Sequence, residues 1–213
     1  VLREAPLRDA DPAAVTATLL DVVRRRGLDV LPWDRASAQL RDRLRFAHAL
    51  DAAWPDVSDA ALLASLDHWL APALHGARRW DDVRRVALGE ALAALLTWPQ
   101  RAVLDELAPT HWTVPTGSRI AIDYSDPAAP SAAVRLQELF GLAETPRVGG
   151  GRVPLTLQLL SPAHRPVQVT RDLAGFWRSS YFDVRRDLRG RYPKHHWPDD
   201  PLKAEPTRRA KRK

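Results

Sequence analysis

Basic and aromatic side chains lie close together in the sequence near the end of the chain, in a pattern that could contact nucleic acid. The cations are Arg178, Arg185, Arg186, Arg189, Arg191 and Lys194, and the flat side chains among them are Tyr192, His195 and Trp197. Arginine and lysine neutralise phosphates, and rings beside them can stack on unpaired bases. We therefore predict that these residues bind RNA or another single-stranded nucleic acid.

The charge of the chain is distributed unevenly. Up to Thr170 there are 19 Lys and Arg against 20 Asp and Glu, whereas from Arg171 onward there are 13 against 6. Every lysine lies in this last part, and Lys211, Arg212 and Lys213 continue it to the end. A polyanion would meet this end first. Basic helix faces and termini also occur in unrelated proteins, so the charge alone leaves binding and simple solvation both open.

The motifs of nucleotide hydrolysis are missing from the sequence. A phosphate-binding loop leads from a strand into a helix and carries a lysine and a hydroxyl group. Gly149-Gly150-Gly151 instead precedes a predicted strand, and Asp105-Glu106 lies in a predicted helix. The serines lack the Gly-x-Ser-x-Gly context of a hydrolase nucleophile. We predict no catalytic residue in this chain.

A metal site and disulfides are not expected either. The chain has no cysteine. His195 and His196 are adjacent, a spacing that splays their rings, while His111 and His164 have no partner at a ligand-like spacing.

The first half of the chain is typical of helices. Asp11-Pro12 marks the start of one helix and Gly27 its end, Asp34 and Ser58 can cap the next two, and Pro99 can open the last. Apolar residues recur at helical spacing throughout this part. Trp54, Trp69, Trp80 and Trp98 lie in or beside these patterns, so we expect them to pack between helices.

The period changes near Thr110. His111 to Val114 with Arg119 to Tyr124 predicts one hairpin, and Val153 to Leu160 with Pro166 to Thr170 predicts a second. A short helix is expected from Ala133 to Phe140, and a closing basic helix from about Asp172 to Arg189. The predicted fold class is α+β, with a helical region at 1–108, an α+β domain at 109–193 and a basic, Pro-rich tail at 194–213. We expect this tail to be extended or mobile and to supply no core.

Membrane and export signals are not evident. The chain has no run of roughly 18 apolar residues, and Val1 to Asp11 lacks the apolar centre of a signal peptide. We therefore expect a cytoplasmic protein with no membrane partner. Because the chain contains no methionine and begins at Val1, we interpret it as a fragment.

Several segments resemble the C-terminal region of HrpB-type helicases, in the same order and spacing. They are Leu104 to His111, Val114 to Ile120, Val134 to Leu142, Leu159 to Pro162, Arg165 to Thr170, Asp172 to Trp177 and Leu188 to His195. The resemblance is specific from about Leu104 to Pro201 and looser over the helical part, which includes Leu31-Pro32-Trp33-Asp34.

The resemblance implies an ATP-dependent RNA helicase in which two RecA-like domains, a winged helix, a helical ratchet-like domain and an oligonucleotide-binding-type barrel precede this region. ATP and Mg are then expected only in that helicase core, with no cofactor in this chain. The core of the same polypeptide is the expected partner. The chain itself is predicted to be a non-catalytic accessory region that helps to bind nucleic acid or to fix the geometry of the core.

Another interpretation is a protein-interaction platform that docks the helicase to a partner. An exposed apolar patch around Trp33 or Trp112 would favour it. An independent hydrolase has little support, because no motif of one is found.

Overall fold

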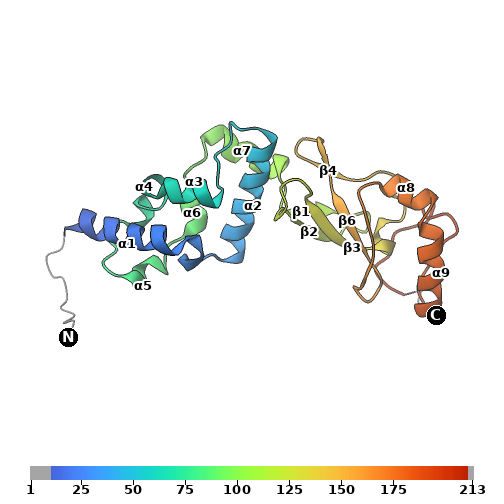
Figure 1. The fold of residues 1–213 in the computed structure, drawn as a ribbon. Helices are drawn as coiled ribbons and strands as arrows, with labels where there is room; N and C mark the ends of the chain where they lie inside the picture. Colours follow the sequence, from blue (N-terminus) through green and yellow to red (C-terminus); the bar gives the residue numbers. More distant parts are fainter. Residues whose placement is uncertain (1–10, 211–213) are drawn as a thin grey trace. The chain divides into compact units, whose positions relative to one another are not determined.

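The computed structural model describes residues 11–210 and divides the chain into two compact units, one ending at Ala102 and one beginning at Val103 (Figure 1). Residues 1–10, considered above for a signal peptide, and Lys211, Arg212 and Lys213 at the basic end lie outside the described residues. Within residues 11–210, no helix is both long enough and apolar enough to span a membrane.

The first unit is built from helices. They are α1 (Pro12–Arg26), the 3-10 helix η1 (Leu28–Val30), α2 (Arg35–Leu50), α3 (Asp59–Ala64), α4 (Leu66–Trp69), the 3-10 helix η2 (Pro72–Leu74), α5 (Trp80–Val83) and α6 (Leu88–Ala93). α7 (Trp98–Leu107) begins in this unit and ends in the second. The helical prediction for this part is confirmed.

Local capping explains where the first helices begin and end. The Asp11 carboxylate accepts a hydrogen bond from the Ala13 backbone N–H (3.1 Å), and Gly27 ends α1 with a φ of 84°. The Asp34 carboxylate accepts from the Ser37 N–H (2.7 Å), and the Ser37 hydroxyl accepts from the Asp34 N–H in return. These reciprocal bonds satisfy backbone donors that the first turn of a helix leaves free.

The helix that Ser58 was predicted to cap, α3, is short. It begins at the Ser58 cap but is interrupted at Ser65, whose hydroxyl donates to the Ala61 carbonyl (2.7 Å). Serine side chains that bond to nearby backbone groups compete with helical geometry in this way.

Two of the four tryptophans expected to pack between helices are buried. Trp54 and Trp69 lie in the core, and the Trp69 indole N–H donates to the Leu62 carbonyl (3.0 Å). Trp80 is half-buried. Trp98 is 81% exposed, so that expectation was wrong. It opens α7, a helix whose one buried residue is Leu104, and no core lies under its first turn.

The second unit contains a five-stranded sheet in the order β1-β2-β3-β6-β7. Its strands are β1 (His111–Thr113), β2 (Arg119–Asp123), β3 (Ser131–Arg135), β6 (Thr156–Leu160) and β7 (Pro166–Thr170). The predicted hairpins are confirmed, because β1 pairs antiparallel with β2 and β6 antiparallel with β7. The parallel pairing of β3 with β6 joins them into one sheet and had no signal in the sequence pattern. The strand predicted from Val153 to Leu160 is shorter, because its first residues, Val153–Pro154, belong to a separate two-stranded sheet.

The short helix predicted from Ala133 to Phe140 is largely wrong. Its first part is strand β3, in which Ala132 and Val134 are buried, and only Leu136–Leu139 turns, as the 3-10 helix η3. Pairing with strands on both sides outweighs the local helical pattern.

The three consecutive glycines form a turn rather than a simple lead-in to a strand. Gly149, Gly150 and Gly151 all have positive φ (67°, 64° and 80°) and connect two short antiparallel strands, β4 (Arg147–Val148) and β5 (Val153–Pro154). Glycine adopts such angles without steric cost.

The closing helix is divided into α8 (Leu173–Arg178) and α9 (Tyr181–Arg191), which corrects the single helix predicted from Asp172 to Arg189. The Ser179 backbone leaves the helical region, and its hydroxyl donates to the Gly175 carbonyl (2.7 Å). Aromatic packing holds this corner: the Trp177 ring lies 5.0 Å from that of Phe176 and 5.3 Å from that of Tyr181.

The segment after Pro193 contributes to the core, contrary to the expectation from its proline and charge content. Trp197 and Pro201 are buried. The Tyr181 hydroxyl donates to the Pro198 carbonyl (2.8 Å), and the Gly141 N–H donates to the Pro201 carbonyl (2.9 Å). These bonds hold the segment beside α9 (Figure 1).

Leu157 tests whether β6, an interior strand of the sheet, carries the core of the second unit. It is 0% exposed in β6, so Leu157→Ala should lower the free energy of unfolding by about 2–5 kcal/mol through lost burial and a cavity. Val169→Ala in β7, where the side chain is 58% exposed, should change it by less than about 0.5 kcal/mol. Urea unfolding measures both, and equal effects would contradict the assignment.

Candidate nucleic-acid interface

The predicted binding cations differ in how far they are free to meet a ligand. Arg178, at the end of α8, and Arg189, in α9, are exposed, as is Lys194 just beyond α9. Among residues 11–210, none of these three has an acidic partner within ion-pair distance. They are therefore available to a phosphate.

Two further cations of the set are exposed but paired. Arg186 forms an ion pair with Asp183, and Arg191 pairs with Asp187 at 3.1 Å. Both arginine side chains are mostly exposed, 79% and 66%. Exposed ion pairs of this kind stabilise a helix little and can exchange partners, so these arginines remain accessible to an anion.

Arg185 has a structural role, because its side chain is bonded to the segment that follows α9. Its side chain is 18% exposed, its Nε donates to the Trp197 carbonyl (3.1 Å), and its guanidinium pairs with Asp199. These contacts fix the segment after α9 on the helix. We therefore separate Arg185 from the exposed cations.

The aromatic residues predicted to stack bases are largely covered. Trp197 is 8% exposed, and its indole N–H donates to the Tyr192 carbonyl (2.9 Å). Trp177, at the end of α8, is also covered: it is 3% exposed, and its indole N–H donates to the Leu142 carbonyl (2.8 Å). Tyr192 is half-buried, with its hydroxyl 3.4 Å from that of Ser161. Their faces pack inside the second unit.

One aromatic residue that the sequence reasoning missed is exposed. Phe182 in α9 is 49% exposed. Arg186 and Arg189 follow it at i+4 and i+7, a spacing that places all three on one face of the helix. Helical periodicity within the predicted basic helix was the available signal, because it places Phe182 beside Arg186 and Arg189.

His195 lies at the edge of this region and takes part in a buried polar network. Its Nδ1 is 3.1 Å from the Gln137 side-chain oxygen, and the Gln137 amide donates to the His196 carbonyl (3.0 Å). Partial burial, with a smaller contribution from the Arg135 charge, lowers the pKa of His195 below its usual value. The neutral imidazole is therefore favoured, and His195 adds little positive charge to the interface.

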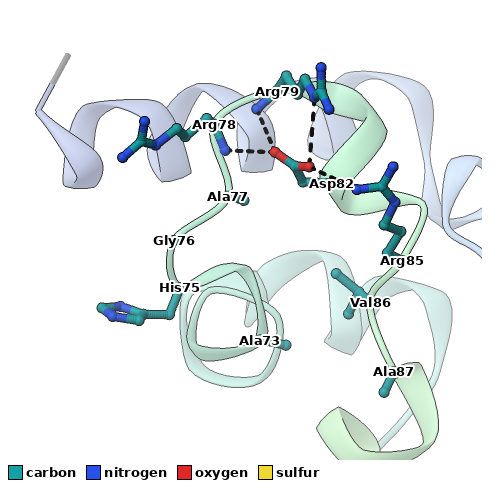
Figure 2. A pocket seen from close by; sticks show the side chains of 10 residues that line it. All are labelled: Ala73, His75, Gly76, Ala77, Arg78, Arg79, Asp82, Arg85, Val86 and Ala87. Carbon is teal, nitrogen blue, oxygen red and sulfur yellow. Dashed lines mark hydrogen bonds and ion pairs between the residues drawn. The ribbon is translucent and has the colours of Figure 1, made fainter. Parts of the chain in front are cut away.

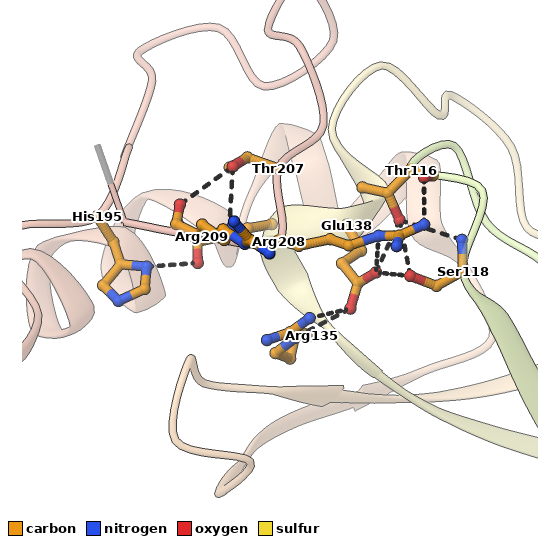
Figure 3. Close-up of polar contacts among 9 residues, drawn as sticks. Thr116, Ser118, Arg135, Glu138, His195, Thr207, Arg208 and Arg209 are labelled. Carbon is orange, nitrogen blue, oxygen red and sulfur yellow. Dashed lines mark hydrogen bonds and ion pairs between the residues drawn. The ribbon is translucent and has the colours of Figure 1, made fainter. Parts of the chain in front are cut away.

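Glu138, the residue after Gln137, is the centre of a second polar network (Figure 3). Its side chain is 4% exposed. One carboxylate oxygen accepts from the hydroxyls of Thr116 (2.7 Å) and Ser118 (2.5 Å), and the other from Arg135 Nε (2.9 Å). Arg208 completes the surroundings, with its Nε 3.8 Å from the carboxylate and its Nη2 donating to the Thr116 carbonyl (2.5 Å).

The network determines the charge state of Glu138. Burial by itself raises the pKa of this carboxyl group, but hydrogen bonds from Ser118, Thr116 and Arg135 and the charge of Arg135 outweigh burial and lower the pKa below its ordinary 4.5. The group is therefore a carboxylate at neutral pH. It joins the β1–β2 turn, the end of β3 and the C-terminal segment.

A hollow in the first unit also carries basic residues (Figure 2). Asp82 is one of the residues that line it and accepts from the backbone N–H groups of Arg78 (2.9 Å) and Arg79 (3.1 Å). The same carboxylate pairs with the guanidinium groups of Arg79 (3.8 Å) and Arg85 (3.7 Å). In Figure 2 the Arg78 and His75 side chains point away from Asp82, so the side chains that line the hollow do not converge on one ligand position.

Within residues 11–210, no three His, Asp or Glu side chains are grouped as a metal site would require.

The fold and the sequence match one class of protein, the C-terminal regions of ATP-dependent helicases. A family model described as HrpB_C, ATP-dependent helicase C-terminal, matches residues 69–201. The ATP-dependent RNA helicase HrpB of Escherichia coli (strain K12) is 46% identical over 209 residues, which cover 97% of this chain and 26% of that protein. The chain belongs to the HrpB family of ATP-dependent helicases and corresponds to its C-terminal region.

Solved structures support the same assignment. A crystal structure of the E. coli DExH-box NTPase HrpB aligns with a TM-score of 0.87 and 44% identity, covering 98% of this chain and 26% of that one. A crystal structure of the E. coli DEAH/RHA helicase HrpB aligns with a TM-score of 0.74 and 42% identity, covering 92% and 25%. The chain thus spans about a quarter of the length of these relatives.

Glu138 should make stability depend on pH in the acidic range. Its pKa is lower in the folded chain, so the unfolded chain takes up a proton first as the pH falls below 4.5, and the stabilisation present above 4.5 is lost. Glu138→Gln should lower the free energy of unfolding at pH 7 by about 1–3 kcal/mol. The difference in unfolding free energy between Glu138→Gln and the parent chain should become smaller as the pH is lowered.

Urea unfolding at pH 7 and pH 4 measures this difference. Glu205→Gln removes an exposed carboxylate from the same C-terminal segment and is the matched control. A constant difference between the parent chain and Glu138→Gln at both pH values would show that the charge of Glu138 is not what stabilises the network.

Proposed function

We propose that this chain is a non-catalytic accessory region of an ATP-dependent RNA helicase and that its basic end contacts single-stranded RNA. The observation that carries the proposal is the pairing pattern of this end. The acidic residues of α9 are paired with Arg186 and Arg191, while Arg178, Arg189 and Lys194 are exposed without an acidic partner in the described part of the chain. The net positive charge therefore resides on particular accessible side chains.

The family supports the rest of the proposal. A relative named as an ATP-dependent RNA helicase makes RNA the natural ligand and the helicase core of the same polypeptide the natural neighbour. ATP and Mg then belong to that core, and the whole protein acts in the cytoplasm. The accessory region adds phosphate contacts that hold the strand or help to fix the geometry of the core.

Trp98 favours a second function, docking to a protein partner. Its side chain is 81% exposed, and Val103 in the same helix is 45% exposed. The sequence instead pointed to Trp33 and Trp112, which are half-buried. Arg41 covers the Trp33 ring at 5.2 Å, and the Trp33 indole N–H donates to the Leu28 carbonyl (2.9 Å). A docking surface would therefore centre on α7.

RNA binding by the basic end should depend on salt. Each phosphate contact releases condensed counterions, so the logarithm of affinity should fall with the logarithm of salt concentration by about 0.7 per contact. Replacing Arg178, Arg189 and Lys194 together by alanine should weaken binding and flatten the slope by roughly two units. Titration of a labelled single-stranded RNA at several salt concentrations measures both effects.

The matched control removes the same charge from the first unit. Arg35, Arg78 and Arg101 are exposed and have no ion pair among the described residues, so their replacement by alanine should leave the slope nearly unchanged. Equal losses of RNA affinity in both triple variants would show that binding depends on net charge and not on the position of the cations. Unchanged affinity in the first variant at low salt would reject the basic end as the binding surface and favour docking through α7.

The purified 213-residue chain should not hydrolyse ATP. Its sequence has no phosphate-binding loop with the lysine and hydroxyl that phosphoryl transfer requires. Phosphate release with ATP, Mg²⁺ and single-stranded RNA should equal that of a protein-free blank. RNA-stimulated turnover that co-purifies with the chain would overturn its assignment as non-catalytic.

A further inference from the structure

Among the Phe, Tyr and Trp residues of the second unit, within residues 103–210, only Phe182 has an exposed side chain. Its ring meets the buried Tyr181 ring edge-on at 5.7 Å and otherwise faces outward from α9. A single exposed apolar side chain is common on protein surfaces and means little by itself. Its neighbours on the helix decide what it can do.

The exposed side of α9 is divided by charge. At 3.6 residues per turn, Phe182, Arg186 and Arg189 fall within a sector of about 60° around the helix axis. Asp183 and Asp187 lie on the adjoining flank and are paired with Arg186 and Arg191. Arg189, nearly in line with Phe182, has no acidic partner among the described residues. An exposed ring is thus aligned with an unpaired cation.

The other aromatic residues of this corner cannot easily perform the same task. Trp177, Tyr181 and Trp197 are buried, and each donates its polar hydrogen to a backbone carbonyl. Exposing any of their faces would break a bond and open the core. Stacking on Phe182 requires no such rearrangement.

We propose that Phe182 stacks on an unpaired RNA base while Arg189, assisted by Arg186, holds the adjoining phosphates. The inference rests on the proposed function, since it assigns a base contact to the surface that function uses. An aromatic face accepts any base, so the contact binds single strands with little sequence preference. Paired bases are stacked within the duplex and do not offer a free face.

Three substitutions of Phe182 in the whole 213-residue chain distinguish base stacking from hydrophobic contact and from charge as the source of RNA affinity. Phe182→Ala removes the ring, Phe182→Leu keeps an apolar side chain without a π face, and Phe182→Trp keeps an aromatic face. Phe182→Ala should lower affinity for a labelled single-stranded RNA by about 5- to 150-fold, the range for loss of one stacked base. The salt dependence of binding should be the same for Phe182→Ala as for the parent chain. Phe182→Leu should bind the RNA nearly as weakly as Phe182→Ala, and Phe182→Trp should bind it as well as the parent.

An abasic strand of the same length supplies the second measurement. Without bases to stack, the parent and Phe182→Ala should bind it equally, whereas Arg189→Ala should still weaken binding and flatten the slope. Equal binding of the parent and Phe182→Ala to the normal strand would overturn the stacking proposal, and an Arg189 effect in that case would leave the proposed function standing. Loss of binding by Phe182→Ala on both strands would also overturn stacking, and unchanged thermal unfolding of the variants checks that they are folded.

Discussion

The Glu138 carboxylate is a buried charge, and the second unit is arranged so that this charge is compensated. A carboxylate removed from water is tolerated only when cations and hydrogen-bond donors surround it in good geometry. Thr116, Ser118 and Arg135 provide them, and they come from the β1–β2 turn and the end of β3. Arg208 adds the C-terminal segment to the same group. One buried charge therefore links parts of the chain that are distant in sequence.

The neighbouring Gln137 extends this constraint toward the basic end. Its side chain bonds to His195 and to the His196 carbonyl, and its own carbonyl accepts from the Thr207 N–H (3.0 Å). The segment held in this way buries Trp197 against α9. Arg185 and the buried aromatic residues are engaged in contacts that hold this segment, whereas Phe182 and Arg189 remain exposed on the outer face of α9. The same contacts thus separate the residues with a structural role from those that remain exposed on α9.

Much of the fold follows from short-range rules. The caps at Asp11, Asp34 and Ser58 and the two hairpins depend on residues a few positions apart, and each formed where the sequence indicated. The strand at Ser131–Arg135 was not predicted, because its pairing with β6 is a contact between segments more than twenty residues apart. The break at Ser179 was also missed, since a serine hydroxyl can bond to the backbone or to solvent and the sequence does not say which.

For the candidate interface, the sequence by itself determined where the positive charge lies, that aromatic residues accompany it, and that the motifs of nucleotide hydrolysis are missing. Only the tertiary structure decided which of those side chains remain outside. Arg185 and Arg189 are alike in the sequence, four residues apart on one helix, yet the first is bonded to the Trp197 carbonyl and Asp199 and the second is exposed. The difference arises because burial depends on the segment that packs against the helix, and the position of that segment is set by the distant contacts of Gln137 and Glu138.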